Sequence, residues 1–151
     1  MDATELARRL LAPIPAHLTL GLEVLRAADG SAEVAAEVPE ALTNVIGSLH
    51  SSGLITLIDA AGLAALIAAV SDPAGFEGVV PLGAAADLRF LAPARGRLTA
   101  SCHLAEAERA SAAAVFNGTA KSARVTTAAE VRDESGRLVC EGSFHWSLRR
   151  R

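Results

Sequence analysis

The stretch SSGLITLIDAAGLAALIAAV, residues 51–70, decides the fold of this chain. Apolar or small side chains occupy nearly every position, so a helix over this stretch is apolar almost all round and must be buried on most sides. Its length approaches that of a membrane span, but a carboxylate at mid-bilayer is costly, and Asp59 lies near its centre. We therefore predict a core helix that ends at Ser71-Asp72-Pro73, in a soluble protein with no membrane partner.

The segments on both sides of this helix have the patterns of strands separated by turns. Two runs before the helix are joined by Ala28-Asp29-Gly30, and two runs near the end of the chain by Asp133-Glu134-Ser135-Gly136; both connections are typical of β-hairpins. Consecutive hairpins with segregated helices indicate an α+β fold with an antiparallel sheet. We expect this sheet to curl around the long helix. The expected strands are 18–27, 31–38, 79–91, 97–107, 124–132 and 137–149, with short helices at 4–11 and 110–116.

The size and composition of the chain fit one folded domain. Its 151 residues are 51% hydrophobic and 21% charged, which suits a single unit spanning residues 1–151 with a real core. Aromatic residues make up only 3%, so the core must consist mostly of Ala, Val, Leu and Ile. Because such small side chains bury little area each, extra burial by self-association would help this core.

Charge and cysteine content exclude several classes of function. A net charge of −3 lacks the basic surface that nucleic-acid binding needs, and we expect the Arg149-Arg150-Arg151 tail to be a solvated end. Cys102 and Cys140 are isolated from one another in the sequence, and we expect both to be buried, reduced thiols. His103 follows Cys102 on a strand and so points to the opposite face, which argues against a metal site. The acidic N-terminus has no secretion signal, and we expect a cytoplasmic protein.

Candidate catalytic residues lie at the start of the long helix. A polar loop with Asn44 and His50 leads into it, and the first helical N–H groups, at Ser51 and Ser52, lie at the positive end of the helix dipole. Such groups can stabilise a developing oxyanion. Asp59 lies about two turns further on, where a carboxylate must be paired, protonated or facing a cavity. Structural roles are open for each: Asp59 at a dimer interface, His50 as a helix cap and Asn44 in an Asx-turn.

The spacing Asn-x5-His-x8-Asp, followed by Ala-Ala-Gly, resembles the signature of PaaI-type hotdog-fold acyl-CoA thioesterases, roughly N-x-x-G-x-x-H-G-G-x-x-x-x-L-x-D. Two further segments resemble parts of that family. DLRFLAPARG (87–96) is similar to the family's strand that ends before a Pro, and GRLVCEG (136–142) is similar to its closing hairpin. Together these segments extend the resemblance over about residues 18–148, and it implies a hotdog fold. The chain matches the signature at Asn44, Gly47, His50, Leu57 and Asp59.

The chain departs from the family pattern in and around this segment. The family's Gly-Gly after the His is Ser51-Ser52 here, which keeps both backbone N–H groups but adds two side chains. Many members have a Ser or Thr about ten residues before the Pro that corresponds to Pro93, and this chain has Gly83 there. The segment 108–121 is longer than the usual family hairpin, and we expect it to form a lid or an edge.

The resemblance implies hydrolysis of an acyl-CoA, with no cofactor apart from the CoA of the substrate and no metal. Asp59 would act as general base on water or attack the thioester itself. The N–H groups of Ser51 and Ser52 would hold the carbonyl oxygen, and Asn44 and His50 would orient the thioester or the water. The site would lie between two protomers of a homodimer, with Asp59 from one facing the loop of the other; tetramers are also open.

Arginine is expected to meet the CoA phosphates, because Lys121 is the only lysine. Arg89, Arg95 and Arg97 flank the end of the strand where members of the family bind the nucleotide end, and arginine forks suit phosphate oxygens. The alternative is that these three form a solvated basic edge.

Two other functions are open. The first is a non-catalytic hotdog domain that binds acyl-CoA or a related ligand; Gly83 and the Ser51-Ser52 pair favour it, whereas Asp59 favours the enzyme. The second is a hotdog dehydratase, which is disfavoured because its usual His-Phe-Pro segment is absent.

Overall fold

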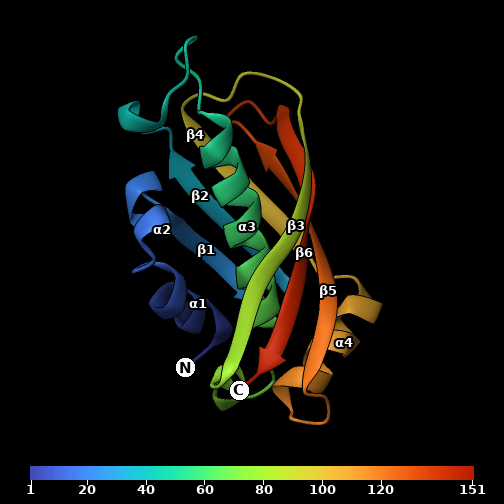
Figure 1. Cartoon of the computed structure of the whole chain (residues 1–151). Helices are drawn as coiled ribbons and strands as arrows, with labels where there is room; N and C mark the ends of the chain where they lie inside the picture. Colours follow the sequence, from blue (N-terminus) through green and yellow to red (C-terminus); the bar gives the residue numbers. More distant parts are fainter.

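Six antiparallel strands form one sheet that curls around a long central helix (Figure 1). The computed structural model describes the whole chain, residues 1–151. The strands are β1 (Glu23–Ala28), β2 (Ser31–Glu37), β3 (Val79–Phe90), β4 (Arg97–His103), β5 (Ser122–Arg132) and β6 (Leu138–Arg150). The helices are α1 (Ala3–Leu11), α2 (Pro15–Leu20), α3 (Ser51–Ala68) and α4 (Glu106–Phe116), with short 3₁₀ turns η1 (Glu40–Leu42) and η2 (Pro73–Phe76).

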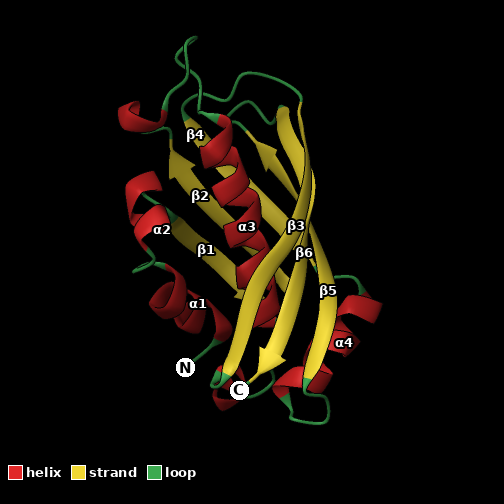
Figure 2. Ribbon diagram, viewed as in Figure 1, coloured by secondary structure: helices red, strands yellow, loops and turns green.

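The strand order in the sheet is β1-β2-β4-β5-β6-β3, so β1 and β3 are its two edges. α3 packs against β2, β4, β5 and β6, whereas α1 lies beside β1 and α4 beside β5 (Figure 2). The predicted α+β architecture, a curled antiparallel sheet around one apolar helix, is therefore confirmed.

Small residues let α3 lie close to the sheet. The alanines in its middle turns have no exposed surface. At Gly62 the approach is closest, because a Cβ there would overlap the hydroxyl oxygen of Thr127 on β5. Trp146 on β6 donates to that hydroxyl at 2.8 Å, so the helix and two strands meet at one hydrogen-bonded contact. By length and composition α3 could span a membrane, but 72% of it is buried inside this fold.

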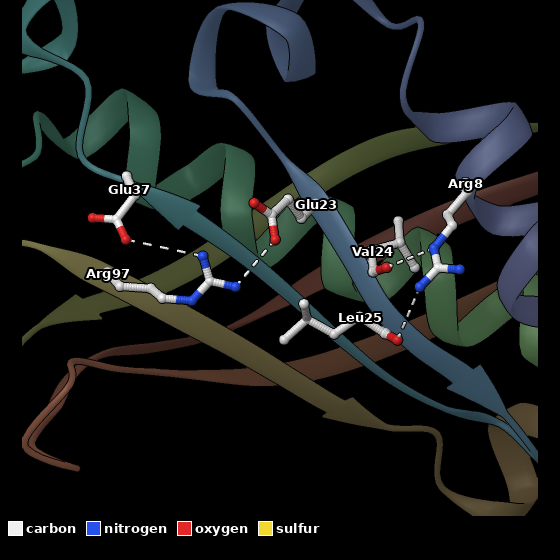
Figure 3. Close-up of polar contacts among 6 residues, drawn as sticks. All are labelled: Arg8, Glu23, Val24, Leu25, Glu37 and Arg97. Carbon is white, nitrogen blue, oxygen red and sulfur yellow. Dashed lines mark hydrogen bonds and ion pairs between the residues drawn. The ribbon is translucent and has the colours of Figure 1, made fainter.

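Side chains of α1 block the outer edge of β1. Thr4 Oγ1 donates to the carbonyl of Ala27 and accepts from its N–H, at 3.1 and 3.0 Å. Arg8 donates to the carbonyls of Val24 and Leu25, at 3.0 and 3.4 Å, where a bulge interrupts the pairing with β2 (Figure 3). These backbone groups are satisfied within the chain, which protects the edge against pairing with another strand.

The opposite edge of the sheet, β3, has no such cover. It pairs with β6 from Val79 to Phe90 and with no other strand. Val79 is its only buried residue, whereas Leu82 and Phe90 are 59% and 54% exposed. A long, apolar, exposed edge strand is a template for pairing with another chain.

α4 occupies the place beside β5 that β4 leaves free. β4 pairs with β5 only up to Cys102, and Glu108 of α4 accepts the N–H of Thr126 further along β5, at 2.8 Å. The segment 108–121, predicted to form a lid or an edge, therefore covers part of the edge of β5.

Three expectations about local structure are wrong. The strand expected to reach residue 107 ends at His103, and Glu106 and Ala107 begin α4. Residues 18–20 end the helix α2 rather than begin a strand: Pro15 starts this helix, and Gly21, with φ of +73°, closes it. In the C-terminal tail, Arg149 and Arg151 are exposed as expected, but Arg150 is not a solvated side chain. Arg150 donates to the carbonyls of Val115 and Phe116 at 2.7 Å, where a cation also suits the negative end of α4.

Replacing Gly62 by Ala should destabilise the protein, although alanine favours helices, because the added methyl would push α3 away from Thr127. We expect the free energy of unfolding to fall by about 1–3 kcal/mol, measured by denaturant titration of Trp146 fluorescence. Thr127→Ala removes the obstructing hydroxyl, so the double variant should lose less than the sum of the two single losses. Strictly additive losses would show that this contact does not limit the approach of the helix.

Candidate active site

One face of α3 is left uncovered by the rest of the chain. Its side chains are exposed or half-buried, whereas those around the rest of the helix are mostly buried. They recur every three or four residues, as positions on one face of a helix do. This face, called the open stripe below, consists of Ser52, Ile55, Thr56, Asp59 and Leu63.

Asp59 is the only charged residue of α3, and it lies on the open stripe. Its carboxylate is half-buried and receives no hydrogen bond or ion pair from the chain. Burial raises the pKa of the Asp59 carboxyl to about 6, because the charged form loses part of its hydration. The structure therefore presents a carboxylate that is open on one side and has its pKa raised to about 6.

The loop before α3 is ordered by the side chain of Asn44. Its Oδ1 accepts the N–H groups of Ile46 and Ser48, both at 3.1 Å, and its Nδ2 donates to the Ser48 hydroxyl at 2.8 Å. Gly47, with φ of +74°, allows the tight turn between them. The amide of Asn44 thus holds the shape of this loop, as an Asx-turn does.

His50 caps the N-terminus of α3. Its Nδ1 accepts the N–H of Ser52 at 3.1 Å and lies 2.8 Å from the Ser52 hydroxyl. Because Nδ1 is an acceptor, a neutral His50 ring carries its hydrogen on Nε2. The two N–H groups that were expected to hold an oxyanion are therefore not equivalent: that of Ser52 is engaged, and that of Ser51 has no partner in the chain.

A mostly apolar pocket of about 310 Å³ opens beside this helix start. The loop before α3 forms one wall, through Asn44 and Ile46, and the last residue of β3 with the four that follow, residues 90–94, forms the other. Ser51, whose N–H is free, lies on its lining, and no charged side chain does. The pocket can therefore hold an uncharged group next to an unpaired backbone donor.

Asp59 and the helix start are not brought together within one chain. Asp59 is eight positions after Ser51, and at a rise of 1.5 Å per residue that is about 12 Å along the helix. A carbonyl held by the Ser51 N–H is thus out of reach of the Asp59 carboxylate of the same protomer.

The three arginines expected to bind CoA lie in three different places. Arg97 forms an ion pair with Glu23 at 3.1 Å and a weaker one with Glu37 at 3.9 Å (Figure 3), and these partners raise the pKa of its guanidinium. Arg89 lines a polar groove of about 650 Å³ on the outer face of the sheet, away from α3. Only Arg95 contacts the loop of the candidate site, where it donates to the carbonyl of Ile46 at 2.8 Å.

Thr56 and Gly83 bear on what the site can do. Thr56 lies on the open stripe three residues before Asp59. The Asn-His-Asp spacing does not include Thr56. In the sequence, only its three-residue interval from Asp59, which puts both on one helix face, could have marked it as a site residue. Gly83 leaves room for a hydroxyl that this chain lacks, because a Cβ there would lie 3.6 Å from the ring of Phe144, an ordinary contact.

No group of three His, Cys, Asp or Glu side chains gathers as metal ligands would.

In sequence, residues 4–148 match the pattern of a protein family described as a domain of unknown function, DUF4442. No curated protein matches the chain.

Solved structures share the fold over nearly the whole chain. A protein of unknown function from Pseudomonas aeruginosa, described as a probable thioesterase, has a TM-score of 0.77 at 28% identity, covering 98% of this chain and 96% of its own. A thioesterase family protein from Silicibacter pomeroyi has a TM-score of 0.77 at 18% identity, covering 99% of this chain and all of its own, 100%. The E. coli PaaI protein of the phenylacetic acid degradation operon has a TM-score of 0.70 at 19% identity, covering 99% and 93%.

The predicted hotdog fold and the resemblance to the PaaI-type thioesterase superfamily are confirmed by these structures. The two matches with less than 25% identity establish the shared fold, and the Pseudomonas protein adds a closer likeness in sequence.

The raised pKa of Asp59 leads to a prediction for stability. The folded chain holds this proton up to about pH 6, whereas the unfolded chain releases it near 3.8, so the stabilising protonated form is lost as the pH rises through 6. Asp59→Asn escapes this loss. Its stability relative to wild type should therefore be greater at about pH 7.5 than at about pH 4, by roughly 1–3 kcal/mol. Equal differences in unfolding free energy at the two pH values would mean that the carboxylate is fully hydrated.

Proposed function

The chain belongs to the DUF4442 family, and from its fold and its site we propose that it hydrolyses an acyl-CoA thioester to the free acid and CoA. One observation carries the proposal: Asp59 is a carboxylate without a partner on the uncovered side of the core helix. Structures described as a probable thioesterase and as a thioesterase family protein support the same reaction class.

We propose that the active unit is a homodimer in which the two β3 strands pair edge to edge. β3 is the open edge of the sheet, whereas α1 blocks the other edge at β1. β3 also lies next to α3, so a partner on this edge would cover the open stripe as well. Exposed large apolar side chains on β3, the open stripe and the pocket rim favour such burial; they are Ile46, Ile55, Leu82, Phe90 and Leu91.

A homodimer supplies the geometry that one chain lacks. A two-fold axis beside β3 would let Asp59 of one protomer face the Ser51 N–H of the partner subunit. The carboxylate and the donor would then come from different protomers, so their separation of about 12 Å along one helix would no longer matter. Asn44 and His50 would then act by shaping the loop and helix start that hold the thioester carbonyl. No metal or further cofactor enters this proposal.

In the proposed step, the oxygen of a water molecule bonds to the thioester carbonyl carbon while one of its protons passes to the Asp59 carboxylate. The carbonyl oxygen gains negative charge and is held by the Ser51 N–H of the partner subunit. The carbonyl then re-forms as the C–S bond breaks. CoA leaves as a thiolate that takes the proton from Asp59, which restores the carboxylate.

For the CoA phosphates we propose Arg95 as the first contact. It holds the Ile46 carbonyl at the pocket rim and is itself exposed, so part of its guanidinium is free for an anion. Arg97 is engaged by two glutamates, and Arg89 lies on the outer face of the sheet, which makes both weaker candidates.

A second function, binding of an acyl-CoA without hydrolysis, is favoured by the capped helix start. The Ser52 N–H is bound to His50, which leaves a single backbone donor for an oxyanion, and Gly83 provides no hydroxyl. Calorimetric titration with a non-hydrolysable acyl-CoA thioether separates the two functions. Tight binding together with no thiol release from the matching thioester would favour the binding protein.

Asp59→Asn keeps the size of the side chain but removes the base. Thiol release from short, medium, long and aromatic acyl-CoAs should fall at least about a hundredfold, with the fold intact. Wild-type kcat/KM should rise with pH up to about 6 and then level off, because only the ionised carboxylate accepts a proton. Asp29→Asn, an exposed change in a hairpin turn, serves as the control. A wild type inactive on all four classes, or a loss of only a few-fold in the variant, would contradict the mechanism.

Leu82→Lys should dissociate the proposed homodimer, because it places a charge on the open edge strand. In light scattering at micromolar concentration, wild type should have twice the chain mass of 15.5 kDa and the variant should approach that mass. Activity should fall in parallel, since the site needs both protomers. Leu25→Lys places the same charge on the blocked edge and should leave the dimer intact. A monomeric wild type with full activity would exclude the shared site.

A further inference from the structure

We propose that Thr56 positions the attacking water for Asp59, so that the two side chains act together as a pair of acceptors on the open stripe. This inference rests on the thioester hydrolysis proposed above. It adds a positioning residue that neither the Asn-His-Asp spacing nor the fold assigns.

Thr56 and Asp59 are neighbours on the surface of α3. They are three residues apart, an interval at which Cβ atoms on a helix lie about 5–6 Å from one another. Because helical side chains lean toward the N-terminus, the Asp59 carboxylate lies over the turn that contains Thr56. Both residues are half-buried, so a water between them is partly withdrawn from the bulk solvent.

The hydrogen of the Thr56 hydroxyl is already used within the helix. Oγ1 donates to the carbonyl of Ser52 at 2.9 Å, and no donor in the chain reaches its lone pairs. The Asp59 carboxylate likewise receives no hydrogen bond. A water between these two acceptors must donate one hydrogen to each, and its own lone pair then points away from the helix, toward a substrate in the proposed dimer interface.

No other side chain of the open stripe offers the same contact. The Ser52 hydroxyl is bound to His50 Nδ1 at 2.8 Å and lies one turn further from Asp59. Ile55 and Leu63, which flank the pair, have no polar atoms. Thr56 is therefore the hydroxyl on this face that can fix the orientation of the nucleophile.

Thr56→Val removes the acceptor and keeps the shape of the side chain. With the acyl-CoA that wild type hydrolyses fastest, we expect kcat to fall by about tenfold to a hundredfold while KM stays unchanged, because the water is misplaced but the substrate is still held. Thr56→Ser keeps the hydroxyl and should recover most of the rate. The pH at which kcat/KM is half-maximal should stay near that of wild type. The double variant with Asp59→Asn should be no slower than Asp59→Asn alone.

Thr19→Val is the matched control, since Thr19 makes the same bond to the carbonyl four residues earlier but is exposed on α2, outside the open stripe. It should leave kcat unchanged. Turnover that is lost in Asp59→Asn but kept in both Thr56→Val and Thr56→Ala would overturn the role of Thr56 alone. Equal losses in the serine and valine variants would also overturn it. Wild type without any turnover would instead contradict the proposed hydrolysis itself, and melting curves of each variant separate loss of rate from loss of fold.

Discussion

The close contact between α3 and the sheet at Gly62 is the constraint on which the rest of the structure depends. A core with almost no aromatic side chains buries little area per residue, so it gains stability only when its small side chains are packed at short distance. Glycine at this point and alanines around it let the helix approach β5 and β6. The single Trp satisfies its N–H on Thr127 at the same contact, so no polar atom is left unpaired there.

The way the sheet covers α3 also determines where chemistry can occur. Six strands enclose most of the helix but leave the open stripe uncovered. At the other edge, Thr4 and Arg8 of α1 satisfy the backbone of β1. One edge of the sheet is therefore closed and the other open. The helix that holds the core together thus also carries Asp59, a half-buried carboxylate without a partner in the chain.

Particular segments show where sequence patterns stop being informative. Leu18, Thr19 and Leu20 alternate as in a strand, yet Pro15 and Gly21 at either end make them helical, and these end signals outweigh the short alternation. Arg150 belongs to a basic terminal run that looks solvated, but the carbonyls that it binds lie 34 and 35 residues earlier in the chain. The three arginines near Pro93 are close in sequence, yet β5 and β6 lie between the strands that carry Arg89 and Arg97, and Arg95 lies in the loop between those strands.

The sequence by itself determined the core helix, the two hairpins and the unusual position of Asp59, because apolar periodicity, turn residues and a lone charge in an apolar segment are local properties. Only the tertiary structure decided which face of α3 is covered, that Arg150 binds the carbonyls of Val115 and Phe116, and that α1 blocks one edge of the sheet while β3 stays open. These properties depend on which strands pair and which side chains meet across the fold. Such contacts join residues far apart in the chain, and no local pattern specifies them.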